Sequence, residues 1–115
     1  RGVPTLQADP GRAADMKLKE GASLKDVSWR MFDAAIKVEM VLAHFVVEMV
    51  ITAGTDGKHM NGSLHYKGLA LDVRSRDLKE EDKQPALAAI KEVLGESFDV
   101  VLEGDHFHIE FDPKG

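Results

Sequence analysis

Two short segments of the 115-residue chain carry four side chains that can coordinate a metal ion. His65 and Asp72 lie seven positions apart in GSLHYKGLALD, and His106 and His108 lie in DHFHIEF. In a strand His106 and His108 share one face, about 7 Å apart at the backbone, so both can reach one cavity. Three nitrogen or oxygen donors with one open position form a catalytic zinc site. The alternative reading of the pattern alone is a set of polar residues on a solvent face.

The composition excludes several other kinds of chemistry. Cysteine is absent, so there is no thiolate nucleophile, and a transition metal must use imidazole and carboxylate ligands. The net charge of −5 comes without a basic cluster, which argues against nucleic-acid binding through phosphate contacts. A chain of this length can form one core without disulfides.

The periodicity indicates how the first half of the chain is organised. Residues 1–22 show no steady period and are predicted to form an irregular N-terminal arm, which leaves 23–115 as a single domain. Apolar residues at helical spacing predict a long helix from an N-cap at Ser23 to about Phe45. The β-branched composition of residues 46–54 then predicts a strand.

The second half of the chain contains the elements that would position the candidate ligands. Residues 69–75 alternate as a short strand, which places Asp72 on its polar face. Pro85 suits the first turn of a helix that stops at Gly95. Residues 98–111 predict two antiparallel strands joined by a tight turn. The order predicts an α+β domain with helices packed on a small antiparallel sheet.

The two segments together resemble zinc metallopeptidases that cut bacterial cell-wall peptides. The first fills the pattern S-x-H-x-x-G-x-A-x-D with Ser63, His65, Gly68, Ala70 and Asp72, and the second supplies the companion H-x-H motif. The group includes D-Ala-D-Ala carboxypeptidases and dipeptidases and the L-alanyl-D-glutamate endopeptidases of phage endolysins. The resemblance implies a hedgehog/DD-peptidase-like fold with a zinc cleft.

The resemblance also implies roles for individual residues. It makes His65, Asp72 and His108 the ligands of one Zn²⁺ ion. It places Asp105 where the family has its general base, which takes a proton from the zinc-bound water. His106 would lie beside the metal and contact the substrate or the oxyanion.

The sequence differs from the family pattern at the residues that would bind the substrate. The family usually carries an arginine after the strand, whereas this chain reads TAGTDG there. Lys58 or a protonated His59 would take its place, although a lysine is a point charge and not a bidentate fork. Ser63 would support the site from the metal loop.

The function expected from these residues is zinc-dependent hydrolysis of a peptide bond in peptidoglycan. A single-domain phage endolysin of the L-alanyl-D-glutamate type is favoured, with a D-alanyl-D-alanine carboxypeptidase or dipeptidase as the alternative. An alternative of another class is a non-catalytic zinc-containing binding module, whose site His106 would close as a fourth ligand.

The expected partners and location follow from the same reading. We expect a monomer whose partner is a peptidoglycan peptide, with no nucleic acid and no stable membrane anchor. No apolar run can span a bilayer, and no basic segment followed by an apolar one marks a signal peptide in this chain. An endolysin of this kind would be made in the host cytoplasm and would act on the cell wall.

Overall fold

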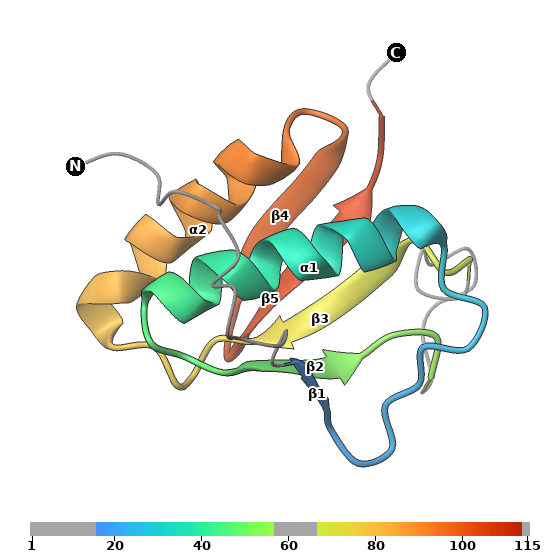
Figure 1. Cartoon of the computed structure of the whole chain (residues 1–115), viewed down its shortest axis with the longest axis horizontal. Helices are drawn as coiled ribbons and strands as arrows, with labels where there is room; N and C mark the ends of the chain where they lie inside the picture. Colours follow the sequence, from blue (N-terminus) through green and yellow to red (C-terminus); the bar gives the residue numbers. More distant parts are fainter. Residues whose placement is uncertain (1–15, 57–66, 114–115) are drawn as a thin grey trace, which may run out of the picture.

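A five-stranded sheet with two helices on one of its faces forms the domain (Figure 1). The computed structural model describes residues 16–56 and 67–113. The strand order is β1-β2-β3-β5-β4. The helices are α1 (Trp29–His44) and α2 (Glu80–Leu94), and the strands are β1 (Met16–Leu18), β2 (Met49–Ala53), β3 (Ala70–Arg74), β4 (Phe98–Glu103) and β5 (His106–Phe111).

The predicted α+β class is confirmed, but the sheet is mixed and not purely antiparallel. Strand β1 pairs in parallel with β2, and every other neighbouring pair is antiparallel. Strand β1 lies inside the 1–22 segment that the sequence predicted to be irregular. The sequence does not reveal this strand, because three residues are too few to show an alternating period. Neither described helix is long and apolar enough to cross a membrane.

The first helix begins later than its apolar period suggested. Its N-cap is Ser28, whose side-chain oxygen accepts a hydrogen bond from the Arg30 N–H at 3.2 Å. The predicted cap at Ser23 is wrong, since the Ser23 N–H instead donates to the Asp56 carboxylate at 2.6 Å. Asp26 has a φ of 61°, a left-handed conformation that a helix does not contain. The segment before α1 is therefore tied to the end of β2.

The second helix begins earlier than predicted. Residues 80–82 are all acidic and form its first turn, where carboxylates interact favourably with the positive end of the helix dipole. Pro85 was predicted in the first turn but lies inside the helix, where it lacks one N–H donor. The predicted stop at Gly95 is confirmed, with a φ of 81° and its N–H bonded to the carbonyl of Lys91.

The apolar core lies between the two helices and one face of the sheet. Alternate residues of β3, β4 and β5 point into it, as the strand period predicted. The opposite face of the same strands carries mainly charged side chains and histidines, together with Ala70 and Val101. The core includes Leu71, Val73, Val100, Phe107 and Ile109 from the sheet and Met31, Val38, Leu42, Ala86 and Ile90 from the helices.

Gly68 fixes the approach of the chain to β3. Its φ is +72°, and a Cβ atom at this position would overlap the carbonyl oxygen of Asp26. The Gly68 carbonyl also accepts a hydrogen bond from the Ser28 N–H at 2.8 Å. The turn that precedes β3 is thus packed directly on the turn that precedes α1, and this contact sets the start of the strand that carries Asp72.

We expect Gly68→Ala to lower the free energy of unfolding by about 2 kcal/mol or more, since strain at a left-handed backbone adds to steric overlap. Urea unfolding of the purified chain measures the change. Gly21→Ala is the control, because Gly21 also has a positive φ, of 89°, but no atom within 4 Å of its Cβ position. Equal losses in the two variants would contradict the close approach at Gly68.

Candidate metal centre

Neighbouring strands place the candidate site residues in three rows on the polar face of the sheet. The central row joins Asp72 of β3 to His108 of β5, and each of the two lies on the strand face that the alternating period predicted. The rows on either side come from the same register. The rows are Arg74, His106 and Glu103; Asp72, His108 and Val101; and Ala70, Glu110 and Asp99.

The imidazole of His108 lies between two carboxylates. Its Nδ1 is 2.9 Å from Oδ1 of Asp72, and its Nε2 is 2.8 Å from Oε1 of Glu110. The three side chains are 16 to 24% exposed, so each is screened from water but reachable from it. Both ring nitrogens therefore have a partner, and the ring orientation is fixed.

Glu110 is a further candidate residue of this site that the family motif does not include. The signal was present, since H-x-H-x-E puts Glu110 on the same strand face as both histidines. The family motif ends at the second histidine and gives no role to the position two residues further on. The structure shows that this carboxylate holds the outer nitrogen of the candidate ligand.

The two carboxylates change the acid–base behaviour of His108. The hydrogen bond to Asp72, with a further one to Glu110, raises the pKa of His108 from 6.5 to about 9, against the opposing effect of desolvation. In the absence of another cation, the ring carries a proton at neutral pH and donates from both nitrogens. The position between these carboxylates is thus suited to positive charge, which a proton or a metal ion can supply.

His106 makes a looser set of contacts at the hairpin end. Its Nε2 lies 3.8 Å from Oδ2 of Asp72 and 3.5 Å from Oε1 of Glu103, while its Nδ1 lies 3.3 Å from Oδ1 of Asp105. The hydrogen bond from His106 is the main reason that the pKa of Asp105 is lowered. Asp105 is exposed in the turn between β4 and β5 and contacts His106.

The residues present fit a zinc ion in their chemistry. One imidazole and one carboxylate meet on adjacent strands, and Zn²⁺ accepts both donor types. A second carboxylate on the far nitrogen of a metal-bound histidine is a recurrent outer-shell arrangement that orients the ring. The structure brings together Asp72 and His108. The other sequence-predicted residues, His65, Ser63, Lys58 and His59, lie outside the described residues.

The fold and the site together define a small α+β domain in which carboxylates on the polar face of the sheet can hold a cation. Comparison with protein families then identifies the class: the Hedgehog amino-terminal signalling domain matches residues 12–111. The chain therefore belongs to the Hedgehog amino-terminal signalling domain family. Comparison with curated proteins gave no match.

The family match corrects the reading of the motifs as those of a peptidase. The chain is not assigned to the zinc peptidases, so the predicted hydrolysis of peptidoglycan and the classification as a hydrolase or endolysin are wrong. The catalytic roles of Asp105 and His106 depended on that reaction. The motif specifies only where candidate ligands lie in the fold. One fold can carry unrelated functions, so the motif does not establish a peptidase.

The expected partner and location change for the same reason. A signalling domain implies a receptor or another signalling protein as its partner, and not a cell-wall peptide. The expectation of an endolysin in a host cytoplasm is wrong as well, because domains of this family are secreted signalling proteins.

Proposed function

We propose that this domain is a signalling ligand that binds a receptor protein through the polar face of its sheet, around one bound Zn²⁺ ion. The observation that carries the proposal is the placement of His108 between Asp72 and Glu110, with contacts of 2.9 and 2.8 Å. The signalling family supports the function. The paired carboxylates support a cation at this position.

Each residue has a separate part in the proposed centre. Asp72 and His108 bind the ion directly, and Glu110 accepts a hydrogen bond from the far nitrogen of His108. His65 is the third ligand that the sequence motif implies. When bound, the ion supplies two positive charges and a fixed coordination geometry, which link strands β3 and β5. The surface around it is thereby held in one shape for the receptor.

The metal is tested by the zinc content of the purified chain after equilibration with zinc and removal of excess. We expect about one ion per chain, and a loss of most of it in Asp72→Ala and His108→Ala, since each removes a direct ligand. Asp33→Ala and His44→Ala are matched controls at exposed positions of α1 and should keep the ion. Full zinc content in both ligand variants would contradict the site.

The signalling function is tested by binding of the fluorescently labelled, zinc-loaded chain to the surface of cells from its source. We expect saturable binding that unlabelled chain displaces. Asp72→Ala should bind more weakly, because the loss of the ion loosens the face that meets the receptor. The Asp33→Ala control should bind normally. Saturable binding that is the same for Asp72→Ala would keep the signalling role but reject the metal-centred face.

A further inference from the structure

Strand β4 lies at one end of the sheet and pairs only with β5 in the described part of the chain. The turn between them has two residues, with a φ of 53° at Gly104, as in a type II′ hairpin. Such a turn makes Glu103 and His106 a hydrogen-bonded pair, and the pattern alternates from there. The backbone N–H and C=O groups of Val100 and Leu102 therefore point away from β5, toward the edge of the sheet that has no neighbouring strand in the described part of the chain.

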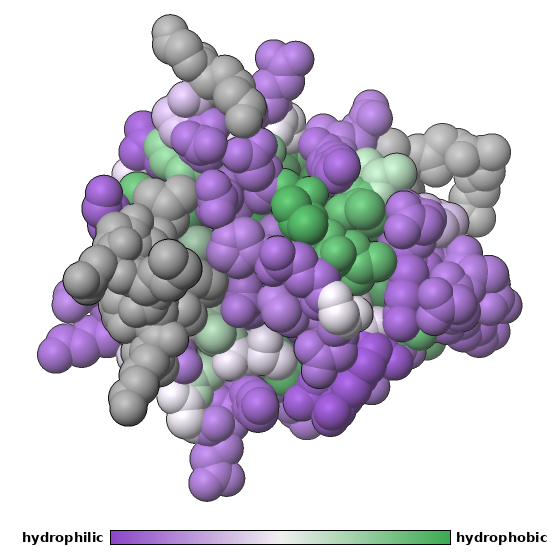
Figure 2. All heavy atoms as spheres, turned by 180° about the vertical axis from the view of Figure 1, so that it is seen from behind, coloured by the Kyte–Doolittle hydropathy of each residue, from purple (hydrophilic) through white to green (hydrophobic). Residues whose placement is uncertain are grey.

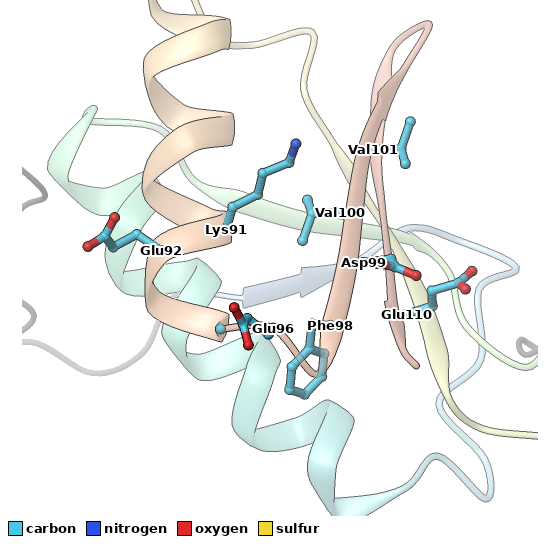
Figure 3. A pocket seen from close by; sticks show the side chains of 9 residues that line it. Lys91, Glu92, Glu96, Phe98, Asp99, Val100, Val101 and Glu110 are labelled. Carbon is cyan, nitrogen blue, oxygen red and sulfur yellow. The ribbon is translucent and has the colours of Figure 1, made fainter. Parts of the chain in front are cut away.

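A groove of about 1020 Å³ runs along this edge, between β4 and the C-terminal half of α2 (Figure 3). The side chain of Lys91 points from α2 toward β4 in this view, and Asp99 and Glu110 lie on the other side of the strand. Seen from behind, the molecule shows one strongly hydrophobic patch among hydrophilic side chains, in the region of α2 and β4 (Figure 2). The open edge thus has a recess beside it.

The side chains on the polar face of β4 alternate between acidic and apolar. Asp99, Val101 and Glu103 point to this face, and Val101 is 47% exposed although it is aliphatic. Negative charge is concentrated at one end, where carboxylate oxygens of Asp99, Glu110 and Asp112 lie within 4.8 Å of one another. A strand laid beside β4 would be matched by the pattern basic–x–apolar–x–basic.

We propose that β4 binds an extended, basic segment of a partner protein, which adds a sixth strand to the sheet. The open peptide groups of Val100 and Leu102 pair with the backbone of the added strand, as in strand addition to other sheet edges. A basic side chain lies opposite Asp99 and another opposite Glu103, while an apolar one covers Val101. The inference goes beyond the proposed signalling function and does not rest on the metal centre.

A second copy of the chain is a poorer occupant of the same edge. Antiparallel pairing of two β4 strands about Val101 would place Asp99 of each copy opposite Glu103 of the other. Like charges in directly opposed positions destabilise a strand pair. The charge pattern therefore favours a basic partner over self-association.

The test uses the full chain and the acetylated, amidated peptide GKTVTKG, titrated by NMR at low salt. We expect shifts in β4 and slower hydrogen exchange of the Val100 and Leu102 amides. GKPVPKG keeps the charge but lacks the two N–H donors that face β4, and GETVTEG reverses the charge. Both should bind at least about tenfold more weakly, because each loses an interaction that fixes the strand.

Variants of the chain locate the binding. Val101→Lys puts a like charge against the peptide and should weaken binding about tenfold or more. Val46→Lys makes the same change at a valine that is 92% exposed outside β4 and should have little effect. Equal binding of the three peptides, or normal binding by Val101→Lys, would overturn the proposal. A concentration-dependent dimer that Val101→Lys abolishes would overturn it too, because β4 would then bind a second copy of the chain. Loss of peptide binding in Asp72→Ala but not in Val101→Lys would place the peptide at the metal centre and would also overturn the proposal.

Discussion

In a chelating buffer, the free energy of unfolding should fall by on the order of 3 kcal/mol as the pH rises from 6.5 to about 9. The folded state raises the pKa of His108 above its unfolded value, so the folded chain binds a proton more tightly. This stabilisation is complete below pH 6.5. It is lost as His108 releases its proton through a pKa of about 9.

Urea unfolding at several pH values measures this profile, with His108→Gln as the variant that should flatten it. Val46→Gln is the control, because it introduces the same amide at a valine that is 92% exposed and has no titratable group, and it should leave the slope unchanged. With saturating zinc the slope should reverse, because only neutral imidazole binds the metal and its binding strengthens as the pH rises. Parallel profiles with and without zinc would contradict the shared position of proton and metal.

Glu110→Gln should weaken zinc binding by about tenfold to a hundredfold while one ion still binds at saturation. The glutamine oxygen can still accept a hydrogen bond from His108, but the negative charge that makes the imidazole a better ligand is gone. Competition with a chromophoric chelator measures the dissociation constant. Weaker binding with one ion still bound at saturation is expected if Glu110 supports His108, whereas a direct ligand would lose the ion when it is replaced.

Glu103→Gln is the matched control for this change. Glu103 lies on the same sheet face, with its Oε1 3.5 Å from Nε2 of His106, and pairs with His106 in the row beside that of His108. Its neutralisation should alter zinc affinity less than that of Glu110. An unchanged affinity in Glu110→Gln would remove Glu110 from the centre, and complete loss of the ion would make it a ligand.

The alternating strands of the site were predictable because their period is simple. In β5 the core residues Phe107 and Ile109 alternate with His106 and His108, which fixes the face of each before any fold is known. The pairing of Asp72 with His108 across two strands was implied only by the family motif. Glu110 needed the structure, because its role depends on the direction in which the His108 ring turns.

The elements that the sequence misplaced are governed by contacts distant in the chain. Ser23 resembles a helix cap locally, yet its backbone is used by Asp56 and Thr55 near the end of β2. Pro85 is tolerated inside α2 because packing outweighs one missing hydrogen bond. The peptidase assignment failed for a different reason, since ligand motifs do not specify whether a bound metal performs chemistry.

The division of β5 into two faces has a consequence for how this domain can diverge. Residues that point toward the helices form the apolar core, while their immediate neighbours in the chain carry the charges of the outer face. Substitutions at the second set change side chains that point away from the core. New recognition preferences can therefore accumulate on a scaffold whose interior is conserved, and the two kinds of change can be selected separately.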